Sequence, residues 1–316
     1  LIEILAGAEI DLFTPSFPQL QEVFNLSPFE VELTLSVNLV AYCFMCIAAG
    51  HLGDRYGRRP FILSGLILFI AGSALCAFAS SFYVLLVGRV LEGIGMAGPA
   101  TLSYIVISDC FSVEEQQKKM GTMNGIISFS MGLAPLLGSY LTLWFHWKAN
   151  FYVLLGLGVV AFLLAYLYLP VRNSDPAVRF SFQNYYSIFK SQTVLLFIIF
   201  LCCMSLVYWV FVGIAPLLYM EDLGVSLNHF GYYQGSLAGV FGLISFISPT
   251  LLNIYGQKKC LIFSLSLLVI FAFGCLVLFI VNTQNPLIIT GVMLLMSMGI
   301  IYPCNLIWPL FLNIMP

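Results

Sequence analysis

The chain has 316 residues, of which 61% are hydrophobic and 8% are charged, and its formal net charge is −2. With a mean hydropathy of +1.01, it has too little polar surface for a water-soluble globular protein. The composition therefore predicts a polytopic membrane protein, and the length of the apolar runs predicts that it is all-α.

Apolar runs of membrane-spanning length recur along the sequence, separated by short polar breaks. A helix needs about 20 residues to cross the ~30 Å hydrocarbon core of a bilayer. On this criterion we expect about ten transmembrane helices, at residues 1–24, 31–52, 60–79, 82–107, 117–143, 150–170, 193–219, 228–254, 260–281 and 286–313. The first span has no initiator Met and the last ends at Pro316 without a tail, so we expect truncation at both ends.

The basic residues lie almost entirely in alternate loops. Such loops face the cytoplasm because Lys and Arg resist translocation; the residues are Arg55, Arg58, Arg59, Lys118, Lys119, Arg172, Arg179, Lys190, Lys258 and Lys259. The opposite loops carry only Lys148, and Arg89 is the one basic residue within a span. We therefore expect an integral membrane protein with its basic loops in the cytoplasm.

The first span contains the carboxylates Glu3, Glu9 and Asp11. A charge near the bilayer centre costs about 2.5–3.5 kcal/mol, so such a group normally faces a bundle interior or water and has a function. We expect Glu3 to snorkel to the interface. Asp11 is the best candidate for a proton carrier, and Glu9 is the second.

The segment Ile-Asp-Leu-Phe-Thr-Pro-Ser-Phe-Pro, residues 10–18, resembles the first-span pattern of the bicyclomycin/chloramphenicol-resistance (Bcr/CflA) branch of drug:proton antiporters. The resemblance implies proton-coupled transport of drugs. Glu9 departs from the apolar residue that this branch has there, which leaves the number of protons open. In the second span, Asn38 and Tyr42 are one helical turn apart, which suits a cavity wall or, as we favour, an interhelical hydrogen bond.

A dense polar loop, Gly50–Pro60, follows the second span. Any short basic loop would satisfy the positive-inside rule, but the pattern G-x-L-G-D-R-x-G-R-R-P resembles the loop signature of the major facilitator superfamily. The resemblance implies a cytoplasmic gate made by Gly53, Asp54, Arg55, Gly57, Arg58 and Arg59. We expect Asp54 to pair with Arg58 or with the Arg partner of Asp109, which ends the fourth span; the alternative for Asp109 is a solvated charge.

Arg89 and Glu92 stand three residues apart in the fourth span, so they can pair on one helix face and lower the cost of burying each other. The segment Gly88–Pro99 resembles the superfamily pattern R-x-x-Q-G-x-G, with Glu92 in the usual Gln position. The resemblance implies a role in proton coupling for Arg89, which Glu92 either shares or blunts. A static buried pair is the alternative.

The fifth span contains Gly132, Pro135 and Gly138. These residues resemble the antiporter motif G-x-x-x-G-P-x-x-G-G, with Ala134 and Ser139 replacing two of its Gly residues. Proline bends the helix and small residues permit close packing, which suits sealing one half of a transporter against the other. Generic packing of small residues is the alternative.

Residues 171–190 form the one long polar connector. We expect a cytoplasmic linker between a six-helix N-terminal bundle, residues 1–170, and a partial C-terminal bundle of about four helices, residues 191–316. A Tyr-Gly repeat at residues 56–57 and 255–256 supports two related halves. Weak candidates for a substrate cavity, with core packing as the alternative, are Asn38, Tyr42, Tyr208, Trp209 and Asn305.

Together these motifs predict a secondary transporter that expels drugs or other small lipophilic compounds in exchange for protons by alternating access. A proton-coupled transporter of a sugar or amino acid and an inactive truncated transporter are the alternatives. Because the sequence has no phosphate-binding loop, metal-spaced His and Cys set or nucleophile elbow, we expect no enzyme, metal or cofactor. The expected partners are a drug-like molecule, protons and the lipid bilayer, with no nucleic acid, and we expect a monomer.

Overall fold

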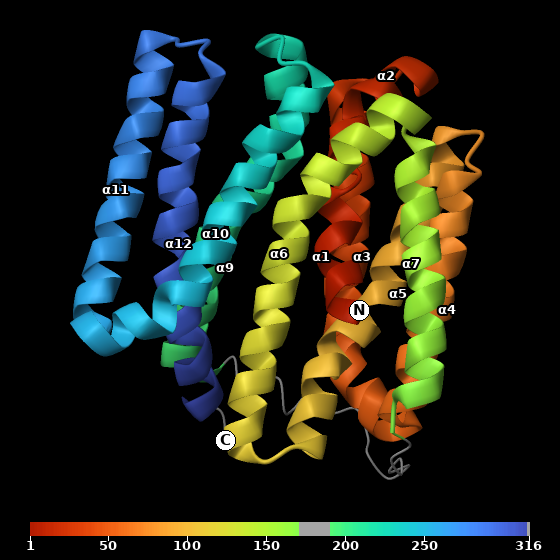
Figure 1. Ribbon diagram of the computed structural model, residues 1–316, viewed down its shortest axis with the longest axis vertical. Helices are drawn as coiled ribbons and strands as arrows, with labels where there is room; N and C mark the ends of the chain where they lie inside the picture. Colours follow the sequence, from red (N-terminus) through yellow and green to blue (C-terminus); the bar gives the residue numbers. More distant parts are fainter. Residues whose placement is uncertain (171–189, 315–316) are drawn as a thin grey trace. The chain divides into compact units, whose positions relative to one another are not determined.

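A computed structural model describes residues 1–170 and 190–314, apart from some side chains within the helices and nearly all side chains from residue 302 onward. Every regular element in those ranges is a helix (Figure 1). Contacts divide the chain into two compact units, Leu1–Phe180 and Ser181–Pro316. The predicted all-α fold is confirmed.

The first span is a broken helix. α1 (Ile2–Asp11) leads through the 3-10 turn η1 (Thr14–Ser16) into α2 (Phe17–Phe24). Pro15 and Pro18 start η1 and α2, where a missing N–H costs no helical hydrogen bond. The break leaves Asp11 at the C-terminal end of α1, and the Thr14 hydroxyl donates to the Asp11 carbonyl oxygen at 3.3 Å.

Buried polar side chains tie this break to the rest of the first unit. Asn150 donates from Nδ2 to the hydroxyl oxygens of Ser16, at 2.7 Å, and Thr142, at 2.8 Å. All three residues are fully buried. Hydrogen bonds of this kind satisfy groups that would otherwise be exposed to hydrocarbon.

The first unit continues with α3 (Pro28–Tyr56), α4 (Arg58–Ala77), α5 (Phe82–Cys110), α6 (Val113–Phe145) and α7 (Lys148–Tyr168). Ser27 and Ser112 start α3 and α6 with capping boxes, in which a Glu three residues later bonds back to the cap. The Ser112 hydroxyl and N–H lower the pKa of Glu115, because both donate to its charged form.

α5 lies at the centre of the first unit and packs along both α3 and α4. Its glycines allow the backbones to approach closely. A Cβ on Gly95 would lie 2.8 Å from the carbonyl oxygen of Gly65 on α4, and one on Gly93 would collide with the carbonyl oxygen of Asn38 on α3. Close approach through small residues is how helices pack in membranes. Because α5 packs closely between α3 and α4, its polar residues lie in the middle of the bundle.

The second unit contains α9 (Gln192–Leu217), the π-helical turn η2 (Leu218–Asp222), α10 (Leu227–Tyr255), α11 (Gln257–Val281) and α12 (Pro286–Ile314). α12 packs against each of the other three long helices. The buried core around Phe211, Phe230 and Met296 is apolar. One polar pair crosses it: the hydroxyl oxygens of Tyr219 and Thr290 are 2.6 Å apart.

The polar segment after the second span is mostly helix, whereas the sequence predicted a loop. α3 continues to Tyr56, and the chain turns at Gly57, whose φ of +92° favours a residue without a side chain. Gly256 makes the equivalent turn between α10 and α11 with φ of +80°. The Tyr-Gly repeat in the sequence therefore has a repeated turn as its structural counterpart.

Eight helices in the described part of the chain are long and apolar enough to cross a membrane. They belong to α3, α4, α5, α6, α7, α9, α10 and α11. α12 adds a shorter apolar stretch, Pro286–Ile301, and the broken first span accounts for the remaining predicted segment. Large apolar side chains such as Phe246, 83% exposed, cover the outside, as expected for a lipid-facing surface.

Candidate functional site

The centre of the first unit holds a buried ion pair on α5. Arg89 Nη1 lies 2.7 Å from Glu92 Oε2, and neither side chain is exposed. The two residues are three apart, so they lie on the same helix face, as the sequence predicted. A buried guanidinium needs such a partner because an isolated ion inside a protein is strongly disfavoured.

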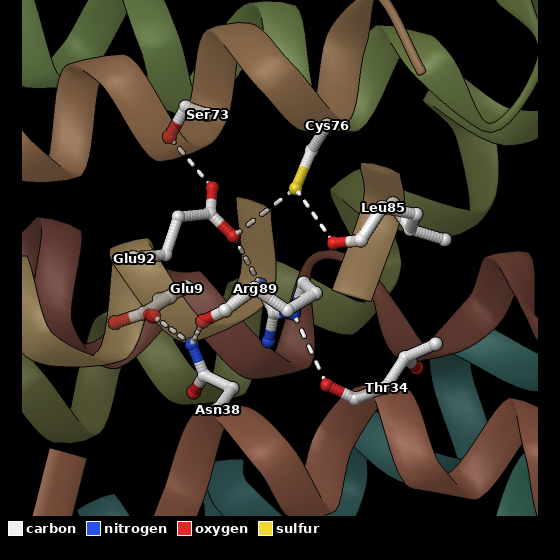
Figure 2. A network of polar contacts seen from close by, with 8 residues as sticks. All are labelled: Glu9, Thr34, Asn38, Ser73, Cys76, Leu85, Arg89 and Glu92. Atoms are coloured by element: carbon white, nitrogen blue, oxygen red, sulfur yellow. Dashed lines mark hydrogen bonds and ion pairs between the residues drawn. The ribbon is translucent and has the colours of Figure 1, made fainter. Parts of the chain in front are cut away.

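α4 contacts this ion pair from one side, which the sequence analysis missed. The Ser73 hydroxyl donates to Glu92 Oε1 at 2.6 Å, and the Cys76 sulfur lies 3.8 Å from Glu92 Oε2 (Figure 2). A Cβ on Gly72 would lie 2.9 Å from Glu92 Cγ, so only glycine allows this approach. In the sequence, the available signal for this contact was Ser73 next to Gly72 in the third span.

α1 and α3 reach the ion pair from the other side. Asn38 Nδ2 donates to Glu9 Oε1 at 2.6 Å and to the Arg89 carbonyl oxygen at 2.9 Å (Figure 2). Arg89 Nε donates to the Thr34 carbonyl oxygen at 3.4 Å. Asn38 therefore makes interhelical hydrogen bonds that join three helices. We call Glu9, Asn38, Ser73, Arg89 and Glu92 the central cluster.

Aromatic rings cover the guanidinium of Arg89. Its carbon Cζ lies 5.0 Å from the ring centroid of Phe13 and 6.0 Å from that of Phe151. Such contacts contribute about 0.5–2 kcal/mol and more in dry surroundings. Arg89 Nη2 is buried and has no hydrogen-bond partner among the described residues. The guanidinium therefore has one nitrogen, Nη2, whose N–H groups are available to another acceptor.

The other two carboxylates of the first span are also buried. Asp11, the preferred candidate from the sequence, is 2% exposed; it is Glu9 that carries the hydrogen bond to Asn38. Glu3 is 4% exposed and accepts a 2.6 Å hydrogen bond from the Ser103 hydroxyl on α5. The expectation that Glu3 snorkels to the interface is therefore wrong, because a polar partner inside the bundle holds it.

At the other end of α3, the residues of the expected gate form a second set of charges. Arg58 pairs with Asp109 on α5, and its Nη2 lies 3.5 Å from Asp54 Oδ1. Arg58 thus serves as the partner of both carboxylates, as the sequence predicted for Asp54. Gly53 brings α3 against α5, since a Cβ there would lie 2.7 Å from Leu102 Cδ1. Arg59 Nη2 donates to the Tyr166 carbonyl oxygen on α7 at 2.6 Å.

Arg55, the remaining basic residue of this motif, is exposed and stacks on its neighbour Tyr56, with 5.4 Å from Cζ to the ring centroid. Asp54 is half exposed, whereas Arg58 and Asp109 are less than one-fifth exposed. Exposed ion pairs contribute only about 0–1 kcal/mol. The contact between Arg58 and Asp54 is therefore weak enough to be broken and re-formed.

The proline-containing motif of α6 lies along the first span. Gly138 packs so closely on Leu12 that a Cβ would collide with the Leu12 carbonyl oxygen. Pro135 lies inside the helix, and the Ser139 hydroxyl donates to its carbonyl oxygen at 2.9 Å. Gly132 is half-buried. The observed contact of Gly138 is thus made within the first unit.

The weak cavity candidates are divided between the two units. Tyr42 is half-buried on α3, four residues after Asn38. In the second unit, the rings of Tyr208 and Trp209 make an edge-to-face contact with centroids 5.5 Å apart. Asn305 lies outside the residues whose side chains are described. Within the described part of the chain, His, Cys, Asp and Glu form no group of three that could hold a metal ion.

Comparisons with known proteins agree with this arrangement of helices. The model of the "Major Facilitator Superfamily" matches residues 1–316. "Multidrug resistance protein MdtL" of Salmonella dublin is 28% identical over 272 residues, which are 83% of this chain and 67% of the relative. The protein of the same name from Salmonella typhimurium strain LT2 is 27% identical over the same length.

Solved structures show the same fold at low sequence identity. A D-xylose-proton symporter superposes with a TM-score of 0.75 at 15% identity, covering 98% of this chain and 81% of the symporter. An inward-facing bacterial homolog of the human lysosomal transporter Spinster gives a TM-score of 0.70 at 16% identity, covering 98% and 72%.

Proposed function

The chain belongs to the major facilitator superfamily, and we propose that it exports drug-like compounds across the membrane in exchange for protons. Membership confirms that the chain is an integral membrane transporter and not an enzyme. The export of drugs is proposed from one observation, the alignment of 83% of the chain with relatives named for multidrug resistance. The buried charges supply a means of coupling export to protons.

Proton coupling is proposed for the central cluster and Asp11. A buried carboxylate favours its protonated form in dry surroundings and its charged form beside a cation. Nη2 of Arg89 has no hydrogen-bond partner among the described residues, so its N–H groups can donate to a second carboxylate. When Glu9 or Asp11 loses its proton, its carboxylate would therefore be attracted to the guanidinium of Arg89. This attraction would link proton binding to the arrangement of α1 and α5.

The proposed gate lies where α3, α4 and α5 meet on the cytoplasmic side. Arg58, Asp54 and Asp109 hold these helices together there. In the proposed cycle, residues 1–170 and 191–316 form two bundles that rock about a central substrate site, with 171–190 as the cytoplasmic linker. The motif at Gly132, Pro135 and Gly138 would seal one bundle against the other during this movement.

The proposed substrate is a small lipophilic compound, and the proposed transporter is a monomer in the bacterial inner membrane with its basic turns in the cytoplasm. Aromatic side chains attract lipophilic cations through stacking and cation–π contact. The proposed lining residues are Asn38, Tyr42, Tyr208, Trp209 and Asn305. Of these, Asn38 also belongs to the central cluster, so substrate and proton sites would share a residue.

Drug susceptibility tests this function directly. Expression of the full-length protein in a bacterium without its own efflux pumps is expected to raise the inhibitory concentration of ethidium several-fold. A protonophore should remove the effect, because the proton gradient drives export. The Arg89→Ala variant serves as the inactive control. Unchanged susceptibility together with proton-driven uptake of a sugar or amino acid would instead support a metabolite transporter.

Removal of the charge at Asp54 is expected to slow transport several-fold without changing expression. The substitution Asp54→Asn keeps the side-chain shape but loses an attraction of about 0.3–1 kcal/mol, whether to Arg58 or to a helix N-terminus. Arg58→Gln should have the larger effect, because it severs the contacts to both Asp54 and Asp109. Ethidium efflux rates measure the change, with Glu32→Gln on the same helix as the control. Parental rates in both variants would rule out a gating role.

A further inference from the structure

The two glutamates of the central cluster have different surroundings. Both oxygens of Glu92 face donors: Oε2 meets Arg89 Nη1 at 2.7 Å, and Oε1 accepts the Ser73 hydroxyl at 2.6 Å. An ionised carboxylate only accepts hydrogen bonds, and bonds to a charged donor are the strongest. This environment is the one that an anion requires. The contacts of Glu92 therefore suit its ionised form.

Glu92 is also fixed in place by backbone contacts. A Cβ on Gly72 of α4 would lie 2.7 Å from Glu92 N and 2.8 Å from the Gly88 carbonyl oxygen. The α4 backbone thus lies directly against the turn of α5 that carries Glu92. Packing this tight holds the backbone of that turn in place. The ion pair with Arg89 belongs to the rigid centre of the first unit.

Glu9 is held differently. Its hydrogen bond in the cluster comes from the neutral amide of Asn38, at 2.6 Å, and its helix α1 is short and ends at the break after Asp11. The charged groups that act on it are Arg89 and Glu92 on α5. Asp11 and Glu3 are the other titratable groups of its own helix, and the neutral phenol of Tyr42 on α3 also interacts with it. The contacts that α6 and α7 make with the first span here come from uncharged residues. The Ser130 hydroxyl donates to the Ile4 carbonyl oxygen, and the Phe151 ring packs on Phe13. Glu9 thus lies beside a cation that Glu92 already neutralises.

The cluster contains two carboxylates and one guanidinium, so it would bear a net negative charge if both glutamates were ionised. A net charge in a dry interior is strongly disfavoured, and two coupled acids then share one proton. We infer that Glu92 is a fixed counter-charge for Arg89, that Ser73 is the positioning residue that keeps it so, and that Glu9 holds the exchangeable proton of the cluster. The inference rests on the proposed proton coupling and adds a second proton site beside Asp11.

Infrared spectroscopy of the purified full-length protein tests this assignment without any substrate. The carbonyl stretch of a protonated carboxyl is followed as a function of pH in an Asp11→Asn background, which removes the contribution of Asp11. We expect Glu9→Gln to remove a pH-dependent band and Glu92→Gln to retain it. In Glu92→Gln the midpoint should move to lower pH by about 1–3 units, since Glu9 then faces an uncompensated Arg89. The opposite result, a band lost in Glu92→Gln and kept in Glu9→Gln, overturns the inference.

Ser73 is tested through its dependence on Glu92. Ser73→Ala removes a hydrogen-bond donor from the Glu92 anion, so Glu92 competes with Glu9 for the shared proton. The midpoint of the carbonyl band should then move to higher pH. In a Glu92→Gln background the same substitution should move nothing. Ser64→Ala on α4, whose hydroxyl bonds only within its helix to the Phe61 carbonyl oxygen, is the matched control. An equal shift in both backgrounds, or none in either, removes the positioning role. If the protein does not export drugs but these bands behave as expected, the proposed function is wrong and the assignment of the proton to Glu9 still holds.

Discussion

Arg89→Ala is expected to abolish proton-driven transport and to destabilise the protein by about 3–5 kcal/mol, the cost of removing one partner of a buried ion pair. The substitution leaves Glu92 fully buried without its cation, beside the Ser73 hydroxyl and the Cys76 thiol. It also removes the Nε contact to Thr34 and the stacking on Phe13. Thermal unfolding of the purified protein and ethidium efflux in cells measure the two effects.

Two further variants separate charge from shape. Arg89→Lys keeps the positive charge but loses the planar group that reaches Glu92, Thr34 and the Phe13 ring together, so it should retain part of the transport. Arg89→Ala combined with Glu92→Gln should recover much of the lost stability, because no uncompensated anion remains, but no transport. If the double variant transports at the parental rate, Arg89 has a structural role only.

The helices were predictable from the sequence because each apolar run must satisfy its own backbone hydrogen bonds within the membrane. The polar segment Gly50–Pro60 was not, since its residues suggest a loop while the structure continues α3 to Tyr56 and turns at Gly57 alone. Gly50 and Gly53 are helical there, and Gly53 serves the close approach of α5 instead of a turn. A glycine in a sequence does not reveal which of these two uses it has.

The site shows the same division between local and distant contacts. The ion pair of Arg89 with Glu92 follows from a spacing of three residues on one helix. The contacts of Ser73 with Glu92 and of Asn38 with Glu9 depend on which helices are neighbours, which no local pattern gives. Glu3 was misjudged for this reason: its partner Ser103 lies 100 residues away in the chain.

The second large effect is expected in the first span, where Glu9 and Asp11 are both buried. Asp11→Asn fixes that side chain in a neutral form, so it is expected to abolish export against a concentration gradient while ethidium binding largely survives. Glu9→Gln should be milder if Asp11 and Glu9 each exchange one proton. The Glu9→Gln variant would still transport substrate. It would release about half as many protons per substrate as the parental protein, since one of two titrating carboxylates remains.

Substrate-induced proton release from purified protein, counted alongside bound ethidium, distinguishes these roles. The parental protein should release the most, each single variant less, and the double variant Asp11→Asn with Glu9→Gln none, because no titrating carboxylate is left in this part of α1. Glu22→Gln, an exposed carboxylate on α2, is the control and should release as many protons as the parent. If Asp11→Asn still exchanges protons at the parental rate, Asp11 is not a carrier. The hydrogen bond from Asn38 and the donor left on Arg89 Nη2 would then make Glu9 the coupling carboxylate of the first span.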